Sequence, residues 1–367
     1  MKTREEYDIV TNYPVPPGAV LEEELEARKM TQRELAQRAG RPVQVINEII
    51  RGKKAVTHET ALDLEKVLGI PAQFWVNLES LYQMTLAKNR EREQLQKQVD
   101  CLKDFPVSEM ERRGWIPSHV DEVDKVRDVL AFLGIASFRD CRLEPAVQFR
   151  LTGAENRISE GALIVWLRKG ELDGREIQTK PYREALFMQA LSKIRALTRE
   201  EPDSFIPKMM RVCSDAGVAV VLTPEFPKSA ANGAARWLSS DKALIQLSLR
   251  WKWADVFWFS LFHEAAHVLR HQTKTVYVDG TDAVDQTVEA EANAFARDIL
   301  LNPMDWARFV DGADWSPYSV IEFANRVGIS PSIVVGRMHH EGIIPYSSLA
   351  HLKARFKWVE RSGSGKA

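Results

Sequence analysis

Apolar positions in residues 20–70 recur every three or four residues, in four short stretches separated by glycine or proline. This spacing predicts amphipathic helices. Thr31 followed by Glu34 is the pattern of an N-cap with a capping box, and Gly40 suits the end of that helix. Pro42 suits the first turn of the next helix. The predicted helices cover residues 20–27, 32–39, 42–50 and 61–68.

The pattern changes after residue 80. Residues 86–97 are densely charged and predict a solvated connecting helix, and residues 104–199 contain amphipathic helical runs without a catalytic constellation. Residues 218–222 are a β-branched run typical of a buried strand. Two further strands and two further helices are then expected, so the fold class is mainly α with a small β-sheet. These later elements are residues 233–238, 243–248, 257–271 and 286–303.

The composition of the 367 residues is that of a globular protein without an extreme charge. Lys and Arg number 50 and Asp and Glu number 51, so the average charge implies no general affinity for nucleic acid or for a membrane. The three cysteines are far apart and fit reduced thiols rather than a disulfide framework. Since neither a signal peptide nor a long apolar run is present, we expect a cytoplasmic protein.

A helix, a tight glycine turn and a second helix form the arrangement of a DNA-binding helix-turn-helix. Ala36 is small where the two helices approach, and Ile46 and Ile49 can pack the second helix onto the first. The outward polar residues could then enter a major groove, where Gln and Asn pair with adenine and Arg with guanine or phosphate. The alternative is a packing unit whose polar face is only solvated. The candidate DNA contacts are Gln32, Arg41, Gln44, Asn47, Arg51 and Lys53.

A His-Glu-x-x-His motif lies inside the apolar helix predicted for residues 257–271. Helical spacing places His263 and His267 on one face, so both imidazoles can bind the same Zn²⁺. Glu264 projects about 100° away round the helix axis. A general base for a zinc-bound water would lie there. The alternative is a pair of packed histidines in an apolar helix.

Two histidines are half of a zinc site, so the third ligand must come from another segment. In the next predicted helix Glu289 and Asn293 share a face, four residues apart. Glu289 can be the third ligand, and Asn293 can accept a hydrogen bond from a ligand histidine and orient it. Glu291 points elsewhere and ranks second as a ligand. Three residues are weaker candidates. His271 continues the same helix face and lies at the helix end, whereas Tyr277 and Arg236 could stabilise an oxyanion.

The N-terminal segments resemble a known family of DNA-binding domains. Residues 30–36, 46–53 and 60–75 are similar to the HigA-type antitoxins within the Xre/Cro repressor family. The resemblance implies binding of operator DNA as a homodimer and a possible cognate toxin. Arg41 and Pro42 depart from the family, where small hydroxyl residues are common at the start of the recognition helix. This departure leaves the operator sequence open.

The C-terminal segments resemble the ImmA/IrrE family of zinc metallopeptidases. The resemblance implies a glutamate-zincin fold with His263, His267 and Glu289 on Zn²⁺ and Glu264 as the catalytic base. It also implies that a regulator protein is the substrate. The segments that carry the resemblance are residues 233, 245–248, 263–267, 289–296, 300–303 and 324–337.

Together these patterns predict a helix-turn-helix domain joined to a zincin-like α+β domain. The predicted function is a DNA-binding regulator with zinc-dependent endopeptidase chemistry, in a toxin–antitoxin or stress system. The alternative is an antitoxin-like autorepressor whose zincin-like domain binds metal or a partner with little cleavage. Residues 323–330 echo the first helix-turn-helix weakly and are expected to be a packing module. The expected regions are 1–85 (DNA-binding), 86–200 (helical middle), 201–345 (peptidase) and 346–367 (tail).

Overall fold

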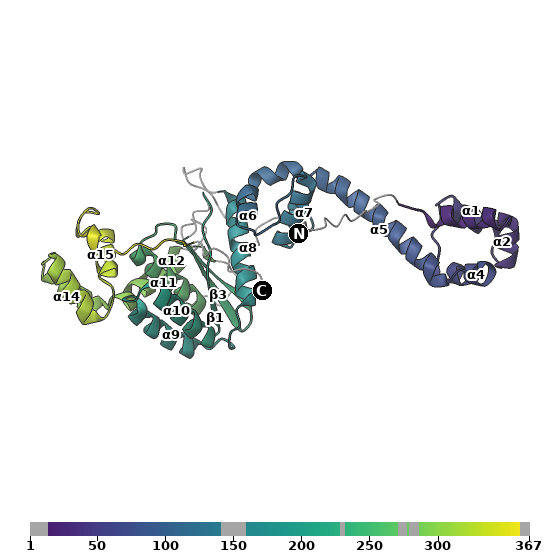
Figure 1. The fold of residues 1–367 in the computed structure, drawn as a ribbon. Helices are drawn as coiled ribbons and strands as arrows, with labels where there is room; N and C mark the ends of the chain where they lie inside the picture. Colours follow the sequence, from purple (N-terminus) through teal and green to yellow (C-terminus); the bar gives the residue numbers. More distant parts are fainter. Residues whose placement is uncertain (1–13, 141–158, 228–231, 271–276, 279–285, 360–367) are drawn as a thin grey trace, which may run out of the picture. The chain divides into compact units, whose positions relative to one another are not determined.

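The computed structural model describes residues 14–140, 159–227, 232–270, 277–278 and 286–359 of the chain. The chain divides into two compact units between Val99 and Asp100. The described part of the first unit is helical (Figure 1). Its helices are α1 (Pro17–Ala27), α2 (Gln32–Arg38), α3 (Val43–Ile50), α4 (His58–Leu68) and α5 (Ala72–Gln96), and a 3₁₀ turn at Val99–Asp104 spans the division.

The ends of α2 are fixed by local chemistry, as the sequence predicts. The Thr31 Oγ1 accepts a hydrogen bond from the Glu34 backbone N–H at 3.1 Å, which satisfies one of the amides left unpaired at the helix start. Gly40 has a φ of +65°, a left-handed conformation that glycine adopts without steric cost. The turn that sets α3 against α2 therefore follows from two residue types at fixed positions.

One hydrophobic core holds the first unit together. Four side chains from four different helices are each 0% exposed: Leu35, Ile46, Leu64 and Trp75. The helix expected to begin at residue 86 is in fact the second half of α5, which starts at Ala72. The sequence misses this continuity because the apolar first half and the charged second half of α5 have different patterns.

Replacing Leu64 by Ala is expected to destabilise the first unit by about 2–5 kcal/mol, since a buried side chain is lost and a cavity is left. Leu62→Ala is the matched control on the same helix, because Leu62 is 52% exposed. Its cost should stay within about 0.5 kcal/mol. Native-state hydrogen exchange of the core amides of α2 and α4 measures both values. Equal losses in the two variants would contradict this packing.

The second unit combines helices with one small sheet. Its helices are α6 (Val107–Arg112), α7 (Glu122–Leu133), α8 (Glu160–Glu176), α9 (Glu184–Leu197), α10 (Pro202–Asp215), α11 (Ala254–Arg270), α12 (Gln286–Leu300), α13 (Pro303–Asp311), α14 (Pro317–Val327) and α15 (Pro331–His340). Its strands are β1 (Val218–Leu222), β2 (Gly233–Ser239), β3 (Lys242–Leu247) and β4 (Tyr277–Val278), and 3₁₀ turns lie at Phe138–Asp140 and Ala350–Leu352.

The sheet has the strand order β1-β3-β2-β4, with β1 parallel to β3 and the other pairs antiparallel. One face packs on α10 and α11 and the other on α8 (Figure 1). On the α8 face, the Gln246 Nε2 donates to the Trp166 carbonyl at 2.7 Å, and the Trp166 Nε1 donates to the Thr223 carbonyl at 3.1 Å. The predicted small sheet is confirmed, and α11 packs on one of its faces.

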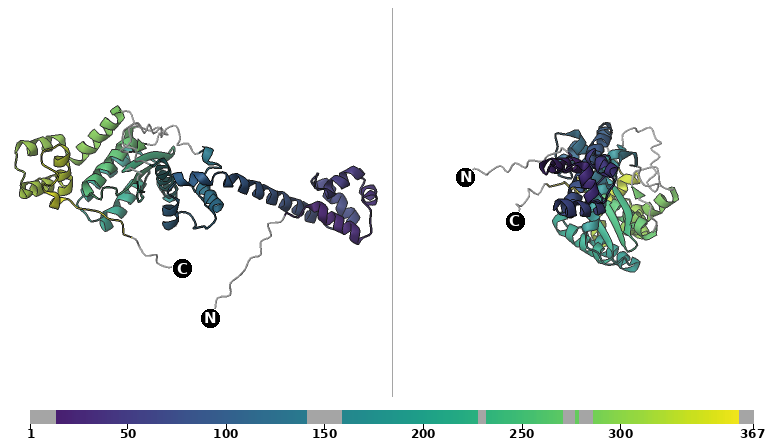
Figure 2. Two further views of the ribbon diagram at one scale, coloured as in Figure 1. Left: turned by 90° about the horizontal axis from the view of Figure 1, so that it is seen from above. Right: turned by 90° about the vertical axis from the view of Figure 1, so that its right-hand side faces the viewer.

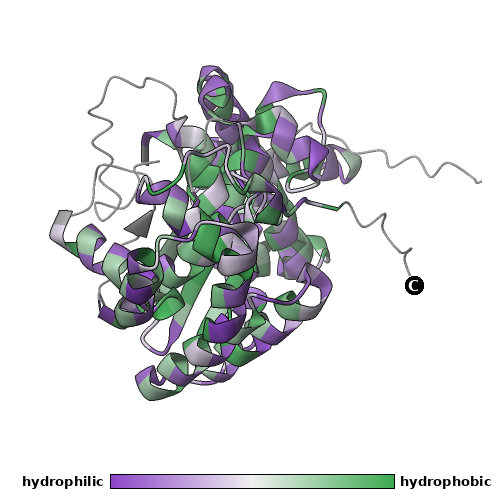
Figure 3. Cartoon of the chain, turned by 90° about the vertical axis from the view of Figure 1, so that its left-hand side faces the viewer, coloured by the Kyte–Doolittle hydropathy of each residue, from purple (hydrophilic) through white to green (hydrophobic). Residues whose placement is uncertain are grey.

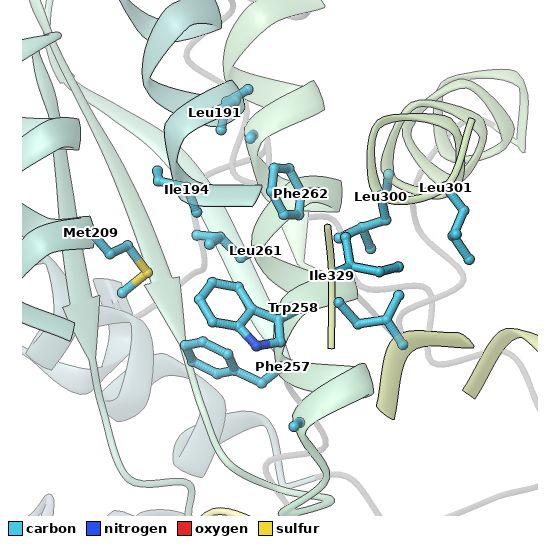
Figure 4. Close-up of a cluster of buried hydrophobic side chains, with 14 of the residues drawn as sticks. Leu191, Ile194, Met209, Phe257, Trp258, Leu261, Phe262, Leu300, Leu301 and Ile329 are labelled. Atoms are coloured by element: carbon cyan, nitrogen blue, oxygen red, sulfur yellow. The ribbon is translucent and has the colours of Figure 1, made fainter. Parts of the chain in front are cut away.

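The core of the second unit surrounds α11. Trp258, Leu261 and Phe262 are 0% exposed. They lie among side chains from neighbouring helices, such as Met209 of α10 and Leu300 of α12 (Figure 4). Hydrophobic residues are concentrated on the strands in the middle of the unit, whereas the helices mix both classes (Figure 3). This packing holds α11 firmly along its length.

The weak internal echo is a packing module, as expected from the sequence. Gly328 has a φ of +75° between α14 and α15, so the local turn does resemble that of α2 and α3. However, α15 lies against α11 in the second unit (Figures 1 and 2). Its side chains Ile333, Val334 and Met338 are buried in the same core. A helix buried in this way cannot also enter a DNA groove.

The predicted regions and the compact units do not share their limits. The predicted boundary after residue 85 falls inside α5, and residues 100–200 belong to the same compact unit as the strands. Part of the predicted tail is ordered, because Arg355 forms a β-bridge with Trp253 and Phe356 packs on Phe257. Residues 361–367 of that tail lie outside the described residues. No described helix has both the length and the apolar character needed to cross a membrane.

Candidate metal centre and nucleic-acid interface

Helix α11 places both motif histidines on one buried face. Their rings lie 4.7 Å apart between centroids, and the two Nε2 atoms are 3.0 Å apart. The side chains of His263 and His267 are each 1% exposed. The helical spacing read from the sequence therefore brings the two imidazole nitrogens to one point beside the helix.

Helix α12 packs along α11 and brings a carboxylate to the same point. The Glu289 Oε2 lies 3.2 Å from the Nε2 of His263, and its Oε1 lies 3.4 Å from the Nε2 of His267. Within the described part of the chain, these three residues form a group whose ligand atoms all lie within 4.8 Å of one another. Glu289 lies 22 positions after His267 in the sequence, so the packing of the two helices creates the group.

The spacing of these three groups fits a tetrahedral zinc ion. With zinc–ligand distances near 2.1 Å, neighbouring ligands of a tetrahedral site lie about 3.4 Å apart. The separations of 3.0, 3.2 and 3.4 Å found between the ligand atoms are close to this value. Two imidazoles and one carboxylate are also the donor set of catalytic zinc sites, which leave a fourth position for water. The residues therefore fit the metal.

Asn293 orients one of the histidines. Its Oδ1 lies 3.0 Å from the Nδ1 of His263, on the ring edge opposite the ligand nitrogen. A hydrogen bond donated by Nδ1–H fixes the tautomer in which Nε2 carries the lone pair. Glu291, the second-ranked ligand, is 57% exposed and lies 3.6 Å from Arg270 instead.

Glu264 is fully buried against the start of β2. A Cβ at Gly233 would lie only 2.7 Å from the Glu264 Oε1, so a glycine is required for the carboxylate to occupy this place. The role of Gly233 is absent from the motif, because the contact joins residues 31 positions apart. The family resemblance includes residue 233, but the reason for a glycine there, its approach to Glu264, is not visible in the local sequence.

The Glu289 carboxyl is held in its charged form by the histidines. Burial raises its pKa, but the hydrogen bonds and charges of His263 and His267 outweigh this effect and lower the pKa to about 2. At neutral pH the group is therefore a carboxylate, the form that binds a metal cation.

Of the three weaker candidates, Arg236 is the one whose side chain is described, and it lies away from His263, His267 and Glu289. Arg236 lies on the sheet face that packs on α8, where its Nη1 is 3.4 Å from the Glu171 Oε2, so it does not face α11. His271 lies outside the described residues. Only the backbone of Tyr277 is described, as part of β4.

The predicted DNA contacts gather on α3 and the residues that flank it. Gln44 is exposed, and its amide donates to the Glu48 Oε1 at 2.9 Å. The Asn47 Nδ2 donates to the Gln32 Oε1 at 3.1 Å, which joins the start of α2 to α3. This pair holds two amide side chains in a defined orientation on one surface.

The cationic candidates differ in their surroundings. Arg41 is paired with Asp63 of α4 at 2.8 Å, and this hydrogen-bonded guanidinium lowers the pKa of the Asp63 carboxyl. Arg51 and Lys53 are exposed directly after α3. Arg41 thus stabilises the position of α3, whereas the two exposed cations are placed to meet phosphates.

The geometry of α2, the Gly40 turn and α3 defines a helix-turn-helix transcriptional regulator. Comparison with known proteins agrees, because the family described as Helix-turn-helix matches residues 21–75. Virulence-associated protein I of Dichelobacter nodosus is 33% identical over 75 residues, which cover 20% of this chain and 69% of that relative. Through its first unit, the chain therefore belongs to the helix-turn-helix family.

Two further similarities concern the same share of the chain. The uncharacterized HTH-type transcriptional regulator YddM of Escherichia coli (strain K12) is 29% identical over 79 residues, which cover 22% of this chain and 83% of that protein. The solved structure of the Pseudomonas aeruginosa antitoxin HigA with the higBA promoter is 28% identical and covers 22% of this chain and 90% of that chain, with a TM-score of 0.22. The family match and the relatives at 33% and 29% identity confirm the predicted helix-turn-helix regulator at the level of this domain.

Proposed function

We propose that this protein is an operator-binding regulator whose second unit is a zinc-dependent endopeptidase acting on a regulator protein. The observation that carries the enzymatic part is the convergence of His263, His267 and Glu289 from two helices. Glu264 is adjacent to His263 on α11, and Asn293 supports that histidine from α12. In this proposal these residues supply the ligands, the base and the orienting residue that metal-assisted hydrolysis requires.

The residues of the chain have separate roles in the proposed reaction. A bound zinc ion would act as a Lewis acid and would lower the pKa of a water molecule to near neutral pH. The Glu264 carboxylate accepts the proton of the attacking water and can return it to the leaving amine. Asn293 keeps the His263 ring in one tautomer, and the apolar neighbours of α11 exclude bulk water from behind the site.

The first unit would bind operator DNA, so the proposed peptidase activity would serve transcriptional regulation. A recognition helix reads base edges from a major groove, and two-fold operators are read by dimers. The HigA structure is named for its complex with a promoter, which agrees with operator DNA as a partner. The homodimer is expected from the two-fold symmetry of such operators. A cognate toxin, or another regulator as the peptidase substrate, belongs to the same proposal.

Replacing Gln44 by Ala is expected to weaken specific operator binding by about 5–150-fold, since one base contact is worth about 1–3 kcal/mol. Gln73→Ala is the matched control, because Gln73 is equally exposed but lies on α5. Both variants are titrated by fluorescence anisotropy against the DNA that lies upstream of the protein's own gene. The proposed groove-reading face is wrong if Gln44→Ala binds as tightly as the Gln73 control.

The peptidase proposal is tested with a library of peptides prepared from a cell extract. Incubation with the zinc-loaded full chain should produce new N-termini, which mass spectrometry identifies. A protein with Glu264 replaced by Gln is the reference, because it differs only in the proposed base. A cleavage pattern identical to the reference would contradict an endopeptidase activity.

A further inference from the structure

A cavity of about 430 Å³ lies beside the metal group, between α11, α12 and α15. Its size is in the range of sites that hold small molecules. Most of its wall is apolar. The apolar lining residues are Val256, Phe259, Leu300, Leu301 and Ile333.

Two arginines and a histidine line the α12 and α15 walls of the same cavity. Arg297 and Arg337 both reach it, and His340 follows one turn after Gly336. The Arg337 guanidinium is only 13% exposed; its Nε donates to the Glu341 Oε1 at 2.8 Å and its Nη1 to the Leu301 carbonyl at 3.2 Å. Five N–H donors are present on each guanidinium, so donors remain for a further acceptor.

The carboxylates of the cavity wall already have cationic partners. Asp255 is paired with Lys353 at 2.7 Å, and Glu341 is paired with Arg337 at 2.8 Å. Among the described residues, Arg297 forms its ion pair with its sequence neighbour Asp298, which is not part of the lining. The site therefore offers apolar contact area together with guanidinium donors, and each of its two carboxylates already has a cationic partner.

We propose that this cavity binds a small amphipathic acid, an apolar body that carries one carboxylate. The apolar walls would cover the body, and Arg297 and Arg337 would donate to the carboxylate in charge-assisted hydrogen bonds. Asn293 also lines the cavity, so a bound acid would contact the residue that orients His263. That link to the metal group rests on the proposed function, whereas binding of the acid does not.

Calorimetry of the full chain with hexanoate, hexanol and hexylamine tests the proposal. The three probes share an apolar chain and differ in charge, and a chelator in the buffer keeps the result independent of zinc. Hexanoate should bind at least about tenfold more tightly than either other probe, since its carboxylate can accept charge-assisted hydrogen bonds from the guanidinium groups. Equal binding of hexanol, or heat from none of the three, would overturn the proposal.

The Arg297→Gln variant tests whether hexanoate binds in this cavity. Its side chain is 47% exposed and bonds only to Asp298 among the described residues, so the variant should fold, and its melting temperature checks this. Hexanoate affinity is expected to fall about fivefold. Arg326→Gln on α14, outside the cavity, is the matched control and should bind like the parent. Unchanged affinity in Arg297→Gln would place the acid elsewhere and refute this site.

Discussion

A protein with Glu264 replaced by Gln is expected to cleave peptides about 10²–10⁴-fold more slowly than the parent, because general base catalysis contributes a factor of this size. Its zinc content should be unchanged, since Glu264 is not part of the ligand group. Gln has nearly the shape of Glu, so the close contact with Gly233 is kept. Initial cleavage rates on a peptide from the library, together with elemental analysis, measure both quantities.

The two readouts of this variant separate the possible functions of the second unit. Loss of cleavage with retained zinc supports an endopeptidase. Zinc retained in both proteins with no cleavage by either would favour the alternative, an autorepressor whose second unit binds metal or a partner without turnover. A Glu264→Gln protein that cleaves as fast as the parent would contradict the role of Glu264.

Replacing Glu289 by Gln is expected to lower zinc affinity by at least about 100-fold, since the loss of a direct ligand should exceed the 10–100-fold cost of losing a supporting residue. The carboxylate supplies the anionic donor between His263 and His267, and a neutral amide is a poorer ligand. Competition with a zinc-binding dye of known affinity measures the change.

Glu291→Gln is the matched control for this prediction. Glu291 lies on the same helix two residues away, is 57% exposed and interacts with Arg270 rather than the histidines. Its zinc affinity should stay within about twofold of the parent. If Glu291→Gln loses zinc and Glu289→Gln keeps it, the assignment of the third ligand is wrong.

The helix-turn-helix could be predicted because its signals are local. The Thr31 cap, the Gly40 turn and the apolar period of α3 each operate within a few residues, and each appears in the structure as expected. The same holds for His263 and His267, whose convergence requires only a continuous helix. Short-range chemistry of this kind is readable from a sequence.

Features that depend on packing between distant segments were less accessible. Glu289 could be proposed because its own helix pattern is clear, but its distance from the histidines depends on how α12 lies on α11. The need for Gly233 beside Glu264 and the cavity between three helices have no sequence signature. The zincin-like architecture and the roles of the site residues remain predictions that chemistry must test.

The most direct test of the account is the zinc content of the purified full chain. Elemental analysis after extensive dialysis should give about one zinc per chain for the parent, since three converging ligands form a defined site. The Glu289→Gln protein supplies the reference for weakened binding. A parent value below about 0.2 zinc per chain, with excess zinc offered before dialysis, would contradict a metal centre at His263, His267 and Glu289.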